Sequence, residues 1–119
     1  MQYILRYNVR PWTVNHERTL HHQQRAKLVK EWREAFFWLA KEQKIPRLAE
    51  VRFVVTPYLK DRRMQDVGAC LPAAKAAIDG LVDAGVLEDD NPKFVKFLGF
   101  NCPVVGQGNG LELLVESCG

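Results

Sequence analysis

Residues 62–90, RRMQDVGACLPAAKAAIDGLVDAGVLEDD, contain the pattern that decides the fold of this chain. From about residue 71 to 84 the apolar side chains recur every three or four positions, which predicts a helix with one apolar face. Gly85 is well placed to end this helix in a left-handed C-cap. The apolar face consists of Leu71, Ala74, Ile78 and Leu81. Because Lys75 lies within the helix and acidic residues precede and follow it, side chains of both charges are expected around this one element.

The segments on either side predict a sheet and a second helix. Residues from about 20 to 44 carry apolar side chains at spacings of three and four, and Pro46 marks the end of that helix. Short alternating or β-branched runs predict strands at 2–9, 49–57, 94–100 and 110–116. The GQGNG stretch at 106–110 is expected to be a hairpin turn. The order strand, helix, strand, helix, strand, strand predicts an α+β fold, with a small mixed sheet and two main helices.

Length and composition predict one domain over residues 1–119. A chain of 119 residues with 47% hydrophobic and 26% charged residues has ordinary globular values. It contains no run of about 18 apolar residues that could cross a membrane. Its first residues, MQYILRYNVRPW, lack the layout of a signal peptide. The three cysteines form no CxxC pair and are expected to be free thiols, so a cytoplasmic protein is expected.

The charge is divided unevenly along the chain. Residues 1–65 contain 14 Lys and Arg against 6 Asp and Glu, whereas residues 66–119 contain 3 against 8. A basic surface beside an acidic patch suits a metal-dependent enzyme that acts on nucleic acid, because the first attracts phosphates and the second holds the cation. The alternative is that these charges only solvate helices and loops.

Lys75 and Asp79 are the first candidates for chemistry. Four residues apart on the predicted helix, they lie side by side at the edge of its apolar face. An exposed ion pair between them would explain both residues without any function. Their position beside the core also leaves room for a role at the lip of a site.

Three further acids flank the helix. Asp89 and Asp90 precede Asn91 and Pro92, so a turn would explain them, but two adjacent carboxylates repel unless a cation is close. Asp66 could be a turn residue or an acid at the start of the helix. If these acids converge, they could hold a divalent metal ion of the kind that phosphodiester hydrolysis uses. A nuclease is therefore the first functional hypothesis.

Other motifs argue against other chemistries. No His-x-Glu, Walker-type glycine loop or Ser-His-Asp order is present, so zinc, nucleotide and acyl-transfer chemistry are not expected. The three histidines lie at 16, 21 and 22 in a polar, basic segment, where phosphate contact or solvation is favoured over metal binding. The three tryptophans, at 12, 32 and 38, are expected in the core or an interface.

With these features together, the chain resembles the RusA-type Holliday-junction resolvases, small metal-dependent endonucleases common in phages and prophages. The resemblance covers most of the chain. It rests on DRR at 61–63, Asp66, KAAID at 75–79, AGVLEDD at 84–90 and GLELLVE at 110–116, with a looser match at VNHER, 14–18.

The resemblance implies a role for each matching residue. Asp66 and Asp90 would be ligands of Mg²⁺ (or Mn²⁺), Lys75 a helper at the phosphate, and Asp79 and Asp89 supporting acids. The family usually has D-x-D-N at the first acid, whereas this chain has Gly68 and Ala69 at the second acid and the Asn. The residues expected to bind DNA are Arg62, Arg63, Lys60, Arg18 and His16.

The functional expectation is a phage-encoded endodeoxyribonuclease in a bacterial host cell. It would act as a homodimer on four-way junctions in DNA recombination and repair, with one site for each of two strands. Two alternatives stay open. One is a non-catalytic DNA-binding protein of the same fold that has lost a ligand acid, and the other is a phage interaction protein whose acidic cluster is structural.

Overall fold

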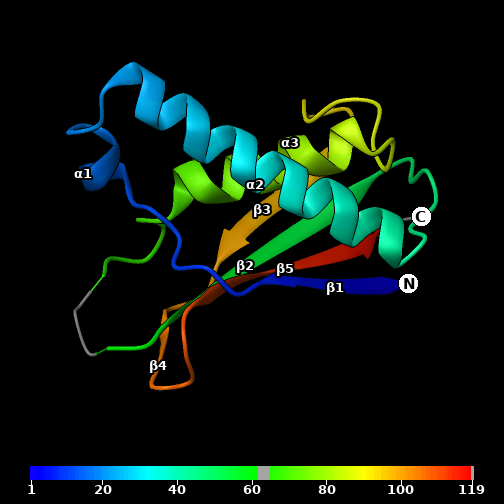
Figure 1. Ribbon diagram of the computed structural model, residues 1–119. Coiled ribbons are helices and arrows are strands. Elements are labelled where there is room, and N and C mark those ends of the chain that lie inside the picture. The colour runs from blue at the N-terminus through cyan, green and yellow to red at the C-terminus, as the bar shows by residue number, and fades with distance from the viewer. Residues whose placement is uncertain (62–64, 119) are drawn as a thin grey trace.

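A mixed sheet carries the long helices on one face in the computed structural model, which describes residues 1–61 and 65–118 (Figure 1). The strands are β1 (Gln2–Tyr7), β2 (Val51–Leu59), β3 (Val95–Phe100), β4 (Val104–Val105) and β5 (Gly110–Ser117). The described helices are α1 (Val14–Glu17), α2 (His22–Glu42) and α3 (Leu71–Asp83). The α+β class and the mixed sheet are therefore confirmed.

The sheet has the strand order β1-β5-β2-β3, and β4 pairs with the far end of β2. β5 runs antiparallel to both β1 and β2, whereas β2 and β3 are parallel. The side chains of β2 alternate, so that Val51, Phe53 and Val55 are buried toward the helices. The parallel pairing of β2 and β3 requires a crossover, and α3 supplies it.

Helices α2 and α3 pack closely because α3 presents small residues to α2. Gly80 is the tightest point, since a Cβ placed there would lie 2.4 Å from the carbonyl oxygen of Arg33. Trp32 and Phe36 of α2 are fully buried and stack at 6.1 Å between ring centroids. The α3 helix ends as expected, with Gly85 at φ +84 directly after the C-cap residue Ala84. The missing side chain of Gly80 therefore lets the second half of α3 lie directly against the backbone of α2.

Two sequence predictions about the strands were wrong. The GQGNG stretch does not join a paired hairpin, because β4 and β5 lie on opposite sides of β2 and both pair with Tyr58. The loop instead crosses the end of β2, where Asn109 Oδ1 accepts a hydrogen bond from the backbone N–H of Lys60. Strand β2 also continues past Pro57 to Leu59. Pro57 falls in the gap between the β3 and β4 pairings, where that edge of β2 has no ladder partner.

The polar, basic segment before α2, for which the sequence predicted no helix, contains one. Residues 14–17 form the short helix α1, because the Thr13 side chain accepts a hydrogen bond from the backbone N–H of His16 and caps it. The N–H of Val14 also donates to the carbonyl of Ala69 at 2.9 Å, which ties α1 to the turn before α3. Among the residues described, no helix is long and apolar enough to cross a membrane. All three cysteines are unpaired, as expected.

Candidate functional site

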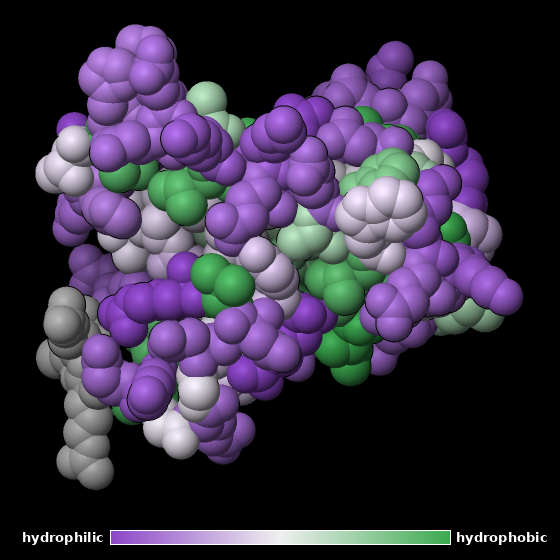
Figure 2. Space-filling model, in the orientation of Figure 1, coloured by the Kyte–Doolittle hydropathy of each residue, from purple (hydrophilic) through white to green (hydrophobic). Residues whose placement is uncertain are grey.

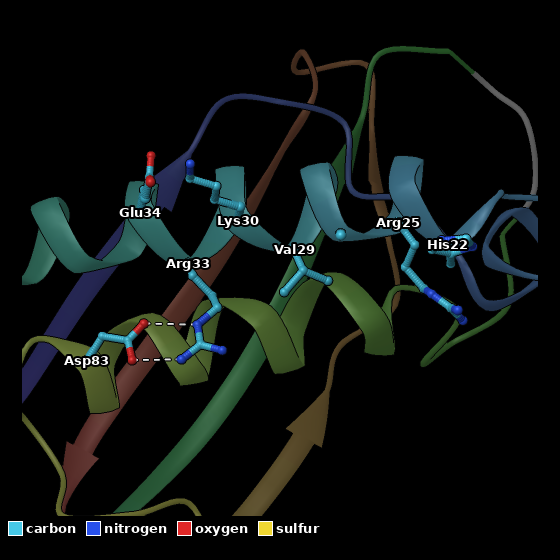
Figure 3. Close-up of a pocket in the computed structure, with 8 residues that line it drawn as sticks. His22, Arg25, Val29, Lys30, Arg33, Glu34 and Asp83 are labelled. Atoms are coloured by element: carbon cyan, nitrogen blue, oxygen red, sulfur yellow. Dashed lines mark hydrogen bonds and ion pairs between the residues drawn. The ribbon is translucent and has the colours of Figure 1, made fainter.

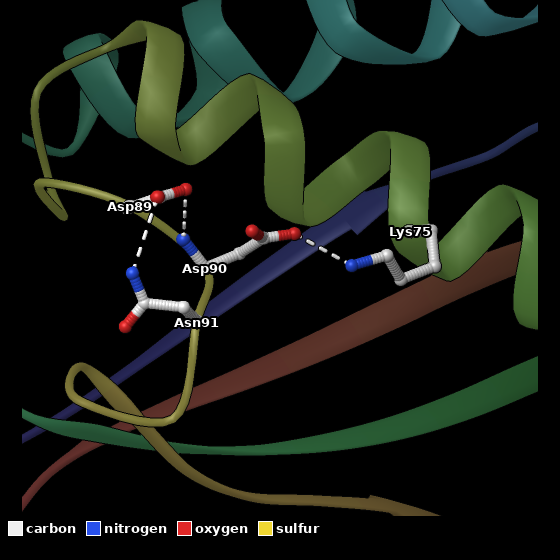
Figure 4. Close-up of polar contacts among 4 residues, drawn as sticks. All are labelled: Lys75, Asp89, Asp90 and Asn91. Carbon is white, nitrogen blue, oxygen red and sulfur yellow. Dashed lines mark hydrogen bonds and ion pairs between the residues drawn. The ribbon is translucent and has the colours of Figure 1, made fainter.

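The centre of the candidate site is a contact between Lys75 and Asp90 (Figure 4). The Lys75 ammonium donates to Oδ2 of Asp90 at 2.6 Å, and the two side chains are 47% and 28% exposed. Lys75 projects from the second turn of α3, and Asp90 comes from the loop that follows that helix. The ion pair therefore joins two segments that meet only because the chain folds back along α3.

Asp89 holds the loop in shape rather than facing Lys75. Its Oδ1 accepts a hydrogen bond from the N–H of Asp90 at 2.7 Å, and its Oδ2 accepts one from the side-chain amide of Asn91 at 3.2 Å. Asn91 Oδ1 in turn accepts from the N–H of Lys93. This pattern is the turn that the sequence allowed, and it orients Asp90 toward α3 (Figure 4). The contacts of Asp89 are therefore within the loop, and the role of a supporting acid at a metal site stays a prediction.

Asp79 and Asp90 are under opposite electrostatic influences. The hydrogen bond from Lys75 lowers the pKa of Asp90 below its ordinary value, although partial burial opposes the shift. Burial raises the pKa of Asp79, and the positive charges of Lys75 and Arg33 only partly offset this effect. The charge of Asp90 also contributes to the raised pKa of Asp79, so the two carboxylates lie within electrostatic range. Two acids with pKa values pushed apart are a common arrangement for acid–base chemistry.

The ion pair expected between Lys75 and Asp79 is not the one that forms. Lys75 turns to Asp90, and the nearby acid Asp83 binds Arg33 of α2 through two hydrogen bonds of 2.9 and 2.7 Å. Spacing along one helix could not reveal either contact, because each joins residues at least 15 positions apart.

The other residues singled out by the sequence do not join this contact. Asp66 lies in the exposed turn before α3, where its carbonyl accepts from the N–H of Ala69. Its carboxylate is not among the charges that shift the pKa of Asp79 or Asp90. Arg62 and Arg63 lie outside the described residues. Three of the residues expected to bind DNA, Lys60, Arg18 and His16, are exposed.

A groove beside the ion pair extends the site toward α1. It encloses about 440 Å³ and is lined by the α3 residues Leu71, Pro72, Lys75, Ala76 and Asp79 together with Val14, Glu17 and Val29. Glu17 is a carboxylate that no sequence pattern indicated, and it reaches this groove because α1 packs near the start of α3. Leu71, Lys75 and Asp79 are each one helical turn apart, so they share one face of α3.

Asp79 and Asp90 are the residues that could hold a divalent cation. Within residues 1–61 and 65–118, no three His, Cys, Asp or Glu side chains lie together as a metal-binding group. Mg²⁺ is commonly bound by only one or two carboxylates, with water and substrate phosphates completing its six ligands. The pair Asp79 and Asp90 fits that pattern, provided that Lys75 moves off Asp90.

Comparison with known proteins adds no assignment. No known family model matches the chain, and no curated protein sequence matches it.

Proposed function

We propose that this protein is a metal-dependent endodeoxyribonuclease similar to the RusA-type resolvases, acting on four-way junctions and other branched DNA. The observation that carries the proposal is the contact of Lys75 with Asp90 beside Asp79. The resemblance singled out these three residues on sequence grounds. Two of them come from α3 and the third from the loop after it, so their proximity does not follow from their positions in the sequence. A phosphodiester is the substrate that suits a lysine placed between two carboxylates of this kind.

Each residue would have a distinct task. Asp79 and Asp90 would supply carboxylate oxygens to Mg²⁺ or Mn²⁺, which when bound lowers the pKa of water and offsets phosphate charge. Lys75 would leave Asp90 when a DNA phosphate arrives and would donate to a phosphate oxygen, where negative charge develops. Lys60, Arg62 and Arg63 would bind the sugar–phosphate backbone. A homodimer would place two such sites on two strands of a junction, as recombination and repair require.

The test is cleavage of a synthetic four-way junction with Mg²⁺ or Mn²⁺. Asp90→Asn and Lys75→Met are expected to lower the cleavage rate by about 100-fold or more, because each removes a group that acts on the reacting phosphate. Glu88→Gln is the matched control, since it removes an exposed acid from the same loop. Cleavage that Asp90→Asn leaves unchanged would refute the site, and loss of cleavage in Glu88→Gln would indicate a general charge effect.

A second candidate, binding of branched DNA without cleavage, is favoured by two specific observations. Asp66 remains outside the contact between Lys75 and Asp90, and the residue one turn before Lys75 on the same face is Leu71, which has no ligand atom. In this case Lys75 would stay paired with Asp90, and no metal ion would take its place. Junction binding at low salt with no cutting in either metal would select this candidate. Absence of junction binding would leave an interaction protein with a structural acidic cluster.

A further inference from the structure

The start of α2 and the segment before it form a projecting, basic part of the molecule, which we call the basic arm and define as residues 15–30. Residues 21–27 are all exposed, and the first buried residue of α2 is Trp32. The arm extends beyond the sheet in Figure 1, and the tip of the same corner in Figure 2 is hydrophilic, with a few apolar residues below it. Leu20, Leu28 and Val29 anchor the arm to the core, but the exposed stretch 21–27 between them carries no large apolar side chain, so its surface is open to a partner.

The charge of the basic arm is strongly one-sided. It carries Arg18, Arg25, Lys27 and Lys30 together with all three histidines, and its one acid is Glu17. None of the four Lys and Arg side chains forms an ion pair or side-chain hydrogen bond with a residue that the structure describes. Elsewhere cations are often paired with carboxylates: this is so for Arg10, Arg33, Arg52, Lys75 and Lys96. Unpaired cations gathered on one projection favour a polyanionic partner over simple solvation.

The cations lie on both sides of α2. Arg25 and Lys30 line a groove of about 540 Å³ between α2 and α3, in which Arg25 points away from the Arg33–Asp83 pair (Figure 3). Lys27 and Lys30 line a second groove, on the side of Tyr7 and Trp38. A helix with its side chains is about 10–12 Å wide, close to the width of the DNA major groove. Cations on both sides of such a helix can reach phosphates of both strands.

We propose that the basic arm enters the major groove of a DNA duplex, with Arg25 contacting one strand, Lys27 the other, and Lys30 lying between them. This inference rests on the proposed function for its choice of DNA, and it adds a second contact region away from Lys75 and Asp90. These contacts would hold one duplex arm of a branched molecule through its phosphates, without reading the base sequence.

The experiment compares two double variants of the full chain. Lys27→Gln/Lys30→Gln removes two charges three residues apart on the arm. Lys41→Gln/Lys44→Gln removes two with the same spacing at the other end of α2 and just beyond it. Affinity for a linear duplex and for a four-way junction is measured by fluorescence anisotropy across a range of salt concentrations. The arm variant is expected to bind about tenfold or more weakly, and its salt slope should fall by about 2, because each lysine releases about one counterion. The control should stay within about twofold.

The outcomes separate this inference from the proposed function. If both double variants weaken binding equally, the arm is not a specific contact and the inference is overturned. If the arm variant binds as wild type does while Lys75→Met loses junction cleavage, the inference fails alone. If wild type binds polyglutamate as tightly as DNA, the partner is an acidic protein, and DNA is the wrong occupant. No DNA binding even at low salt would overturn both proposals.

Discussion

The ammonium of Lys75 and the carboxylate of Asp90 meet at 2.6 Å although 15 residues separate them in the sequence. The contact fixes the loop after α3 against the second turn of that helix. It also favours the anionic form of Asp90 by lowering its pKa, whereas burial raises the pKa of the neighbouring Asp79 and favours its neutral form.

Lys75→Met should raise the pKa of Asp90 toward its ordinary value, because the hydrogen bond from Lys75 is the main cause of the depression. A depressed carboxyl pKa contributes stability that is present above the unfolded-state value, about 3.9, and is lost as pH falls through the folded-state value. Both side chains are partly exposed, so the variant should lose only about 0.2–1 kcal/mol at pH 7. NMR titration of the Asp90 carboxyl carbon and urea unfolding at pH 7 and pH 3 measure both effects. Unchanged titration of Asp90 would contradict the contact.

Asp79→Asn should behave in the opposite way. Burial raises the pKa of Asp79, so the folded protein binds this proton more tightly than the unfolded chain does. The free energy of unfolding of wild type then falls as pH rises from the unfolded-state pKa, about 3.9, through the raised folded-state pKa of Asp79. It stays lower at higher pH. The variant should therefore be as stable as wild type at pH 3, and equally or more stable at pH 7. Asp83→Asn is the control and should be less stable at pH 7, because it removes the partner of Arg33. A loss of stability in Asp79→Asn at pH 7 would refute the assignment.

The local patterns were predictable from the sequence, and the contacts between segments were not. The α3 helix and its end at Gly85 follow from apolar spacing and a glycine, both of which act within a few residues. The expected pair of Lys75 and Asp79 did not form, because the loop geometry set by Asp89 brings Asp90 to Lys75. The predicted hairpin between β4 and β5 is likewise absent because β4 pairs with β2 instead. That pairing is possible because β3 stops pairing at Val55 and leaves Tyr58 and Leu59 to β4. Long-range geometry of this kind leaves no periodic signal in one sequence.

Gly80→Ala should destabilise the protein although alanine is the better helix former. In an isolated helix the change would gain about 1 kcal/mol. In the folded protein the new Cβ would lie 2.4 Å from the carbonyl oxygen of Arg33, which is backbone and cannot turn aside. Overpacking of this kind costs about 1–3 kcal/mol, measured as a lower urea midpoint. Gly85→Ala tests a different cause, because nothing lies within 4 Å there but φ is +84. Gly85→Asn should destabilise the protein less than Gly85→Ala does, because asparagine tolerates a positive φ. Gly80→Asn should be no more stable than Gly80→Ala.

Leu71→Asp should increase the affinity of the site for a divalent cation. Leu71 is 39% exposed and lines the same groove as Lys75 and Asp79, one turn before the lysine on one face of α3. A carboxylate there would add a third acid to a group that now has Asp79 and Asp90, and cation affinity rises with the charge of the ligand set. Titration calorimetry with Mn²⁺ in the absence of DNA should show binding at least about tenfold tighter than in wild type.

Leu71→Asn is the matched control for that variant, since it is similar in size to aspartate and carries no charge. If Asn and Asp raise Mn²⁺ affinity equally, the effect is access to the groove rather than a new ligand. If neither variant raises Mn²⁺ affinity, a side chain at position 71 does not reach a cation held by Asp79 and Asp90. If wild type binds junctions without cutting them, a gain specific to Asp and accompanied by junction cleavage would mean that the chain retains the scaffold of a nuclease and that Leu71 is what separates binding from cutting.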